Sequence, residues 1–168
     1  MIPETFDPPR THDFGAFKLA VLAPCFAAQD FQAVHASADT LHSVFSADDG
    51  WPDPQMTFEE NLADLTRHAR EFDERVAFAY ALLSTTGDQY VGCLYIYRIK
   101  SRREHDRRKT LFQAQAFLWL NVLQTTVSDE LALSCIQTWL STTWPLTQVA
   151  WPGRVQTWSE WEALADSL

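Results

Sequence analysis

The sequence predicts one α/β (α+β) domain, in which a mixed, mostly antiparallel sheet carries helices on both faces. Apolar runs rich in β-branched and aromatic residues cover 76–83, 90–97 and 111–122, and they indicate three consecutive strands. Helical periodicity precedes and follows these runs, so helices are available for both faces of the sheet. The chain has 168 residues, so we expect residues 1–168 to form a single domain with a substantial core.

The first third of the chain predicts an arm, a strand and two helices. Residues 1–15 contain three prolines and little periodicity, and they predict an extended N-terminal arm. Residues 17–22 (FKLAVL) predict a strand. The first helix is indicated by apolar residues at helical spacing: Phe31, Val34, Ala38, Leu41 and Phe45. Thr57 and Glu60 form a Thr-x-x-Glu capping box that predicts the start of the second helix.

The remaining elements follow from turn and cap signals. The link at residues 84–88 is of hairpin length and contains Gly87, so the strands on either side should be antiparallel. Ser128 precedes an apolar segment that ends at Pro145, and it predicts a capped helix over about 129–144. Residues 147–151 predict a short strand. The helix before it implies a crossover and therefore a parallel pair. A tail helix is expected over 157–168.

The charge and the cysteines exclude several classes of protein. A net charge of −9 argues against general nucleic-acid binding and against binding to anionic membranes. No apolar run approaches the length that spans a bilayer. The three cysteines are widely spaced without a metal or redox pattern, and they indicate reduced thiols in the cytoplasm. The acidic, proline-rich start does not resemble a signal peptide.

Residues 98–109 are an exception to this acidic character. They contain seven basic and two acidic residues, a net +5 in a chain of net −9. Three interpretations remain open: a solvated loop, a docking site for an acidic partner, or an intramolecular contact with the acidic remainder of the chain.

The predicted order of strand, two helices, three antiparallel strands, helix and strand over residues 17–151 resembles the GNAT superfamily of N-acetyltransferases. Residues 91–96 (VGCLYI) are similar to the third strand of that family, where a glycine is often followed by alternating apolar residues. Trp51–Pro52, residues 57–62 and residues 78–80 resemble a bacterial branch of acetyltransferase-like proteins. The resemblance implies transfer of an acetyl group from acetyl-CoA to an amine of a small molecule or peptide.

The family follows its fourth strand with the motif Q/R-x-x-G-x-G/A, whose glycines let backbone amides approach the diphosphate of coenzyme A. The corresponding residues here are 124–129 (QTTVSD), so Val127 and Asp129 stand in place of the glycines. By resemblance, the cofactor should lie against a strand and the loop after it: Phe117, Leu118, Trp119, Leu120, Gln124, Thr125, Thr126, Val127, Ser128 and Asp129.

These two replacements support a second interpretation. A carboxylate at residue 129 would repel a diphosphate by roughly 4 kcal/mol at an effective dielectric constant near 20. Ser128 as cap, with Asp129 and Glu130 in the first turn, would instead stabilise the helix itself. The alternative function is therefore a catalytically silent binding or regulatory module that has lost coenzyme A binding.

The usual catalytic groups of the resembled family are missing. Its fourth strand often carries a glutamate base, whereas this chain has Gln113 and Gln115, and no tyrosine follows Val122. His68 and Glu60 are the best remaining candidates for a base that acts through water. His35, Asp39 and His42 share helical spacing, but they lie opposite the apolar stripe and we expect no metal site. Expected partners are the amine acceptor, an acidic partner for segment 98–109, and a second copy of the chain in a homodimer.

Overall fold

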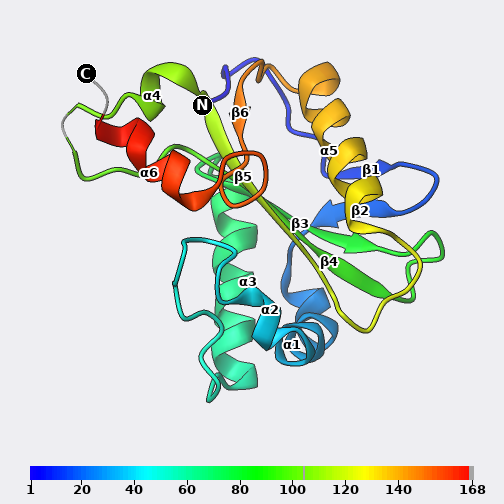
Figure 1. Ribbon diagram of the computed structural model, residues 1–168. Coiled ribbons are helices and arrows are strands. Elements are labelled where there is room, and N and C mark those ends of the chain that lie inside the picture. Colours follow the sequence, from blue (N-terminus) through cyan, green and yellow to red (C-terminus); the bar gives the residue numbers. More distant parts are fainter. Residues whose placement is uncertain (104, 167–168) are drawn as a thin grey trace.

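A six-stranded sheet forms the centre of the computed structural model, which describes residues 1–103 and 105–166. The spatial order of the strands equals their order in the chain (Figure 1). The strands are β1 (Thr11–Asp13), β2 (Lys18–Val21), β3 (Phe78–Leu83), β4 (Tyr90–Tyr97), β5 (Ala114–Leu120) and β6 (Val149–Ala150). Neighbouring strands are antiparallel, except that β5 and β6 are parallel. The predicted mixed, mostly antiparallel sheet is therefore confirmed.

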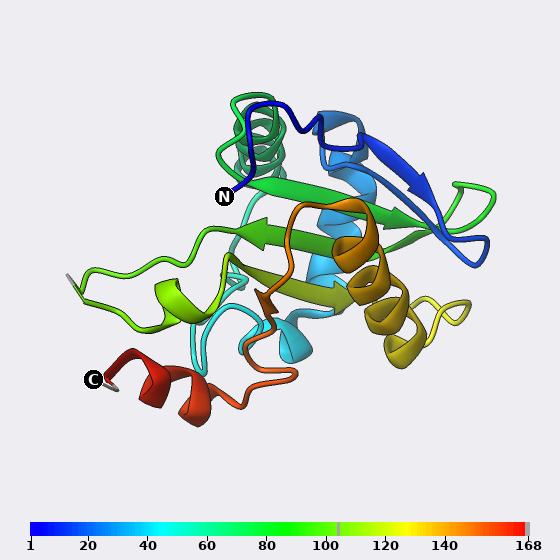
Figure 2. The ribbon, with the colours of Figure 1, turned by 90° about the horizontal axis from the view of Figure 1, so that it is seen from above.

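The helices cover both faces of this sheet (Figures 1 and 2). They are α1 (Ala27–Ala36), α2 (Ala38–Leu41), α3 (Phe58–Asp73), α4 (Arg108–Leu111), α5 (Asp129–Thr143) and α6 (Trp158–Asp166), with a 3-10 turn η1 at Pro24–Phe26. Because side chains alternate along a strand, the sheet contributes to two separate cores. Leu94 and Leu118 pack in the core that contains α5, whereas Tyr95 and Trp119 pack in the core that contains α1 and α3.

Two predicted helix caps are present. The Thr57 hydroxyl accepts the backbone N–H of Glu60 at 3.2 Å, and the Glu60 carboxylate accepts the N–H of Thr57 at 2.7 Å. Ser128 Oγ accepts the N–H of Leu131 at 3.2 Å and caps α5. These caps satisfy amides that have no partner inside the helix, which is why local sequence was enough to locate them.

Three elements differ from the prediction. The first helix is broken at the buried Ser37, whose hydroxyl accepts the N–H of Val122 from the loop after β5 at 3.1 Å. The expected strand at 111–122 spans only Ala114–Leu120, because Leu111 ends α4 and residues 112–113 connect that helix to the strand. The expected N-terminal arm includes β1, which pairs with β2 and extends the sheet. Residue 104 of the basic segment and residues 167–168 of the tail helix lie outside the described residues.

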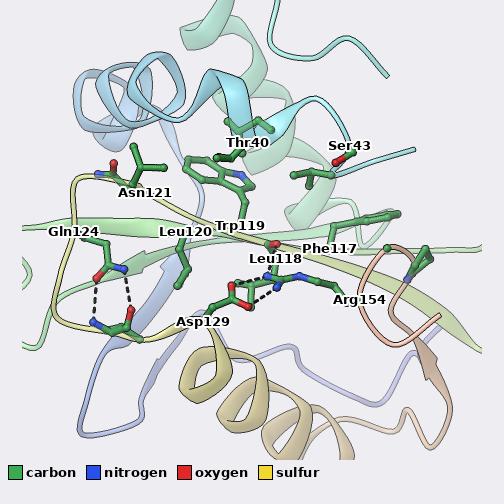
Figure 3. Close-up of a pocket in the computed structure, with 16 residues that line it drawn as sticks. Thr40, Ser43, Phe117, Leu118, Trp119, Leu120, Asn121, Gln124, Asp129 and Arg154 are labelled. Carbon is green, nitrogen blue, oxygen red and sulfur yellow. Dashed lines mark hydrogen bonds and ion pairs between the residues drawn. The ribbon is translucent and has the colours of Figure 1, made fainter. Parts of the chain in front are cut away.

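The parallel pair β5–β6 is very short, so most of one edge of β5 has no strand beside it. Its register joins only Ala114 with Val149 and Gln115 with Ala150, while β5 continues to Leu120. Over residues 116–120, no strand of the described chain pairs with that edge of β5. The start of α5 and the turn after β6 lie beside this edge instead (Figure 3). Within the described residues, no helix is long and apolar enough to cross a membrane.

Candidate functional site

A cavity of about 490 Å³ lies beside the unpaired edge of β5, and we call it the strand-edge cavity (Figure 3). Its walls come from α2, β5, the loop after β5, the start of α5 and the turn after β6. Seven of the ten residues that the resemblance assigned to the cofactor line it: Phe117, Leu118, Trp119, Leu120, Gln124, Val127 and Asp129. The other three, Thr125, Thr126 and Ser128, do not. The sequence did not point to Thr40, Ser43 or Arg154, which complete the walls.

The loop that replaces the glycine motif is closed on itself by Gln124. Its side-chain oxygen accepts the backbone N–H groups of Thr126 and Val127, each at 3.0 Å. Its side-chain nitrogen donates to the carbonyl oxygen of Val127 at 2.8 Å. Two amides that could otherwise face an anion therefore already have an acceptor. The Val127 side chain is buried in the core with α5.

Asp129 does not present the isolated negative charge that the sequence suggested. Arg154, from the turn after β6, forms an ion pair with both oxygens of its carboxylate, and the Nη2–Oδ1 distance is 2.8 Å. The same Nη2 donates to the carbonyl oxygen of Leu118 on β5 at 3.1 Å. The expected repulsion of about 4 kcal/mol is therefore offset by a neighbouring cation. This correction could not come from local sequence, because the partners are 25 residues apart.

A second cavity, of about 470 Å³, adjoins the first at Phe117, and we call it the aromatic cavity. It lies between α3, the loop after α2, the ends of β4 and β5, and α6. The two cavities are also linked by a hydrogen bond, because Trp119 Nε1 donates to the Tyr95 hydroxyl at 3.3 Å. Trp119 lines the strand-edge cavity and Tyr95 lines the aromatic cavity. This hydrogen-bonded pair therefore lies between the two cavities.

His68 lines the aromatic cavity, and its side chain is buried. Burial, together with the nearby charges of Arg67 and Lys100, lowers the pKa of His68 to about 4, although Glu71 opposes this shift. The ring is therefore neutral at pH 7. Nε2 lies 3.4 Å from the guanidinium of Arg67, which can only donate, so we assign the proton to Nδ1. Nδ1 has no hydrogen-bond partner in the structure.

Glu60, the other candidate base, lies outside both cavities. Its carboxylate accepts the N–H and the hydroxyl of Thr57 at the start of α3. Asp64, on the next turn of α3, lines the aromatic cavity and forms an ion pair with Arg67 at 3.3 Å. In the described part of the chain, no three His, Cys, Asp or Glu residues are grouped as metal ligands.

Segment 98–109 makes an intramolecular contact at one end. Arg108 is buried, and it binds the Asp106 carboxylate at 2.8 Å and Glu162 of α6 at 3.4 Å. Its guanidinium also lies over the ring of Trp161, 4.8 Å from the centroid. Hydrogen bonds from Arg108 hold the pKa of Asp106 well below its ordinary value. This contact fixes α6 against the aromatic cavity and supports one of the three interpretations of the segment.

The lowered pKa of His68 predicts a pH-dependent stability. As the pH falls below 6.5, the unfolded chain binds a proton at this residue, whereas the folded chain does not until about pH 4. We therefore expect the free energy of unfolding to fall by about 3 kcal/mol over this range through His68 alone. Urea denaturation of the wild type and of His68→Phe at pH 7 and pH 4.5 measures this difference.

The raised pKa of the buried Asp30 opposes this trend in both proteins, so the difference between them isolates His68. His35→Phe, at an exposed position of α1, controls for the loss of a histidine. Equal pH dependence in the wild type and in His68→Phe would contradict the prediction.

Comparison with known proteins gives matches to solved structures. No protein-family model and no curated protein sequence matches the chain. Ribosomal-protein-S5-alanine acetyltransferase from Vibrio fischeri superposes with a TM-score of 0.55 at 11% identity, over 78% of this chain and 67% of that one. A ribosomal L7/L12 α-N-protein acetyltransferase in complex with coenzyme A gives a TM-score of 0.54 at 17% identity, over 74% and 63%.

A nucleotide-linked sugar GNAT enzyme gives a TM-score of 0.53 at 9% identity, over 80% of this chain and 67% of its own. The chain thus spans about two thirds of the length of the proteins it matches. Identities this low carry the fold and no further property. The strand order, the single parallel pair after α5 and these superpositions agree: the protein has the fold of the GNAT superfamily of N-acetyltransferases.

Proposed function

We propose that the protein is an N-acetyltransferase that transfers the acetyl group of acetyl-CoA to an amine. The observation that carries this proposal is the pair of cavities that meet at Phe117. One follows the unpaired edge of a strand, and the other is an aromatic chamber with charged groups. Two molecules bound side by side there would have their reacting ends next to one another. Structural neighbours that acetylate ribosomal proteins S5 and L7/L12 support the same class of reaction.

The strand-edge cavity fits the extended arm of coenzyme A better than it fits the diphosphate. Backbone groups of residues 116–120 are free of a strand partner on this side. Apart from the Leu118 carbonyl, which Arg154 binds, they can bind an amide-containing chain. The amides of Thr126 and Val127 are already bound to Gln124, so the positive groups left for a diphosphate are Arg154 and the start of α5.

Acetyl-CoA would supply a thioester: the amine nitrogen would bond to the acetyl carbon and lose a proton, the carbon–sulfur bond would break, and the leaving thiolate would finally take up the proton that the nitrogen lost. We assign the proton to His68, through water, because its imidazole is neutral at pH 7. Nε2 can accept it once the Arg67 guanidinium moves from its position at 3.4 Å. We assign Glu60 no role in the reaction, because it lies outside both cavities. We place the reaction in the cytoplasm, in keeping with three free cysteines.

Calorimetric titration with acetyl-CoA tests the cofactor site. Thr40 is exposed on α2 and lines the strand-edge cavity, so Thr40→Trp should block the cavity and weaken binding by at least about tenfold. Thr66→Trp is the matched control, since Thr66 is exposed on α3, lines neither cavity and has the same kind of hydroxyl bond to its own helix. Equal affinities of the two variants would place the cofactor elsewhere.

One observation favours a second function. The hydrogen bonds of Gln124 to Thr126 and Val127 leave the loop satisfied without an anion. A binding or regulatory module that does not use coenzyme A would have a loop of this kind. If calorimetric titration with acetyl-CoA at high micromolar concentration gives no heat of binding, the result favours the binding module and rejects the proposed acetyltransferase activity.

A further inference from the structure

The carboxylates that line the aromatic cavity already have partners. Asp49 accepts the backbone N–H groups of Phe45 and Trp51 at 2.8 and 2.6 Å. The buried Asp30 accepts the Tyr90 hydroxyl at 2.6 Å. Asp64 and Glu162 form ion pairs with Arg67 and Arg108. A ligand therefore meets acids whose charge is offset or whose oxygens are occupied.

Two nitrogen donors in the same cavity have no acceptor within hydrogen-bond distance among the described residues. Lys100 lines the cavity, and no carboxylate of the described residues lies within ion-pair distance of its ammonium group. Its Nζ lies 4.5 Å from the centroid of the Tyr97 ring, which holds it at the cavity. His68 is 7% exposed, and its Nδ1, which carries the proton in the tautomer assigned above, has no hydrogen-bond partner; Glu71 Oε2 lies 3.7 Å away, beyond hydrogen-bond distance. A buried donor without an acceptor costs about 1–3 kcal/mol, so Nδ1 of His68 favours an acceptor on the ligand. Lys100 is exposed, and it contributes an unpaired positive charge at the cavity.

The remaining wall is aromatic. Phe117 and Trp158 are stacked with their planes 18° apart, and Tyr95 and Tyr97 are stacked with their planes 15° apart. Trp51 and Trp161 also line the cavity. Rings arranged in this way bind a flat ring by stacking or edge contacts.

We propose that the aromatic cavity binds a carboxylate with an aromatic ring, whose anionic group contacts Lys100 and the Nδ1–H of His68. The Lys100 end of the cavity lies near Gln115, which pairs with Tyr97, whereas Phe117 lies at the strand-edge cavity. Two residues along a strand span about 6–7 Å, roughly the width of one ring. This step rests on the proposed function: we assign the acceptor amine of the bound aromatic carboxylate to the end of the cavity at Phe117.

Calorimetry with 4-methylbenzoate tests the anion site without any acetyl transfer. We expect binding that weakens about tenfold in Lys100→Ala, as for loss of a hydrogen-bonded charge, and that weakens with added salt. Lys109→Ala is the matched control: it removes the same charge from the same basic segment, and Lys109 lines neither cavity. The wild-type affinity should remain in Lys109→Ala. Absence of binding, or equal affinity in Lys100→Ala and the wild type, would overturn the proposal.

Mass spectrometry with acetyl-CoA tests the amine. We expect 4-(aminomethyl)benzoate to be acetylated at least about tenfold faster than 4-methylbenzylamine, which lacks the carboxylate. Equal rates for the two amines would overturn the anion site. If neither amine is acetylated while 4-methylbenzoate binds through Lys100, the proposed function fails at this step and the carboxylate site stands.

Discussion

Asp129→Asn is expected to strengthen acetyl-CoA binding by about tenfold, because it leaves the Arg154 guanidinium without its carboxylate partner at the strand-edge cavity. Arg154→Gln should have the opposite effect and weaken binding by about tenfold or more, since it leaves Asp129 as an unpaired negative charge beside a diphosphate. The double variant should return close to the wild-type affinity. Calorimetric titration of all four proteins at low ionic strength gives the complete cycle.

Pantetheine is the control ligand for this cycle, because it lacks the diphosphate. Its affinity should be the same in Asp129→Asn and in the wild type. A stronger affinity for acetyl-CoA in Arg154→Gln would contradict the prediction, and it would mean that the Arg154 bonds to Asp129 and Leu118 obstruct the cavity. This outcome separates an arginine that attracts the cofactor from one that excludes it.

Gly92→Ala is expected to lower the free energy of unfolding by about 3 kcal/mol, because β4 and β5 approach very closely at this residue. A Cβ atom at Gly92 would lie 2.1 Å from the carbonyl oxygen of Trp119 and 2.9 Å from the Cα of Leu120. These are backbone atoms, so the strand itself must move. Urea denaturation monitored by tryptophan fluorescence measures the loss.

Gly15→Ala separates this contact from the conformational cost of replacing a glycine. Gly15 has φ +81° and no atom within 4 Å of the added Cβ, so only a loss of about 1 kcal/mol is expected. Equal losses at the two positions would show that β5 accommodates the methyl group of Gly92→Ala. Since Trp119 and Leu120 line the strand-edge cavity, a displaced β5 should also weaken acetyl-CoA binding.

Local sequence was sufficient where an element is specified by its own residues. The apolar runs at β3 and β4 specify strands buried on both faces, and Thr57 and Ser128 specify helix starts through bonds to residues three positions away. The crossover through α5 constrains the β5–β6 pair to be parallel. Such interactions join near neighbours in the chain, or follow from how far a chain of given length can reach.

The candidate site could be predicted only in part, because several of its walls come from segments that are far apart in the chain. Strand β5 and its following loop form one wall, and the resemblance located that wall. The other walls come from Thr40 and Ser43, and from Arg154. These residues are distant in the sequence from β5 and from one another. Nothing in the local sequence predicted that Arg154 would extend to Leu118 and Asp129.

The sequence by itself therefore determined the order of β2 to β6 and of the long helices between them, the caps of α3 and α5, and the strand on which the cavities depend. These features result from periodicity and from bonds between near neighbours. Only the tertiary structure decided the break at Ser37, the neutralisation of Asp129 and the contact of the two cavities at Phe117. Each of these arises where side chains from distant segments meet, and their charges and hydrogen bonds depend on distances that only the folded chain defines.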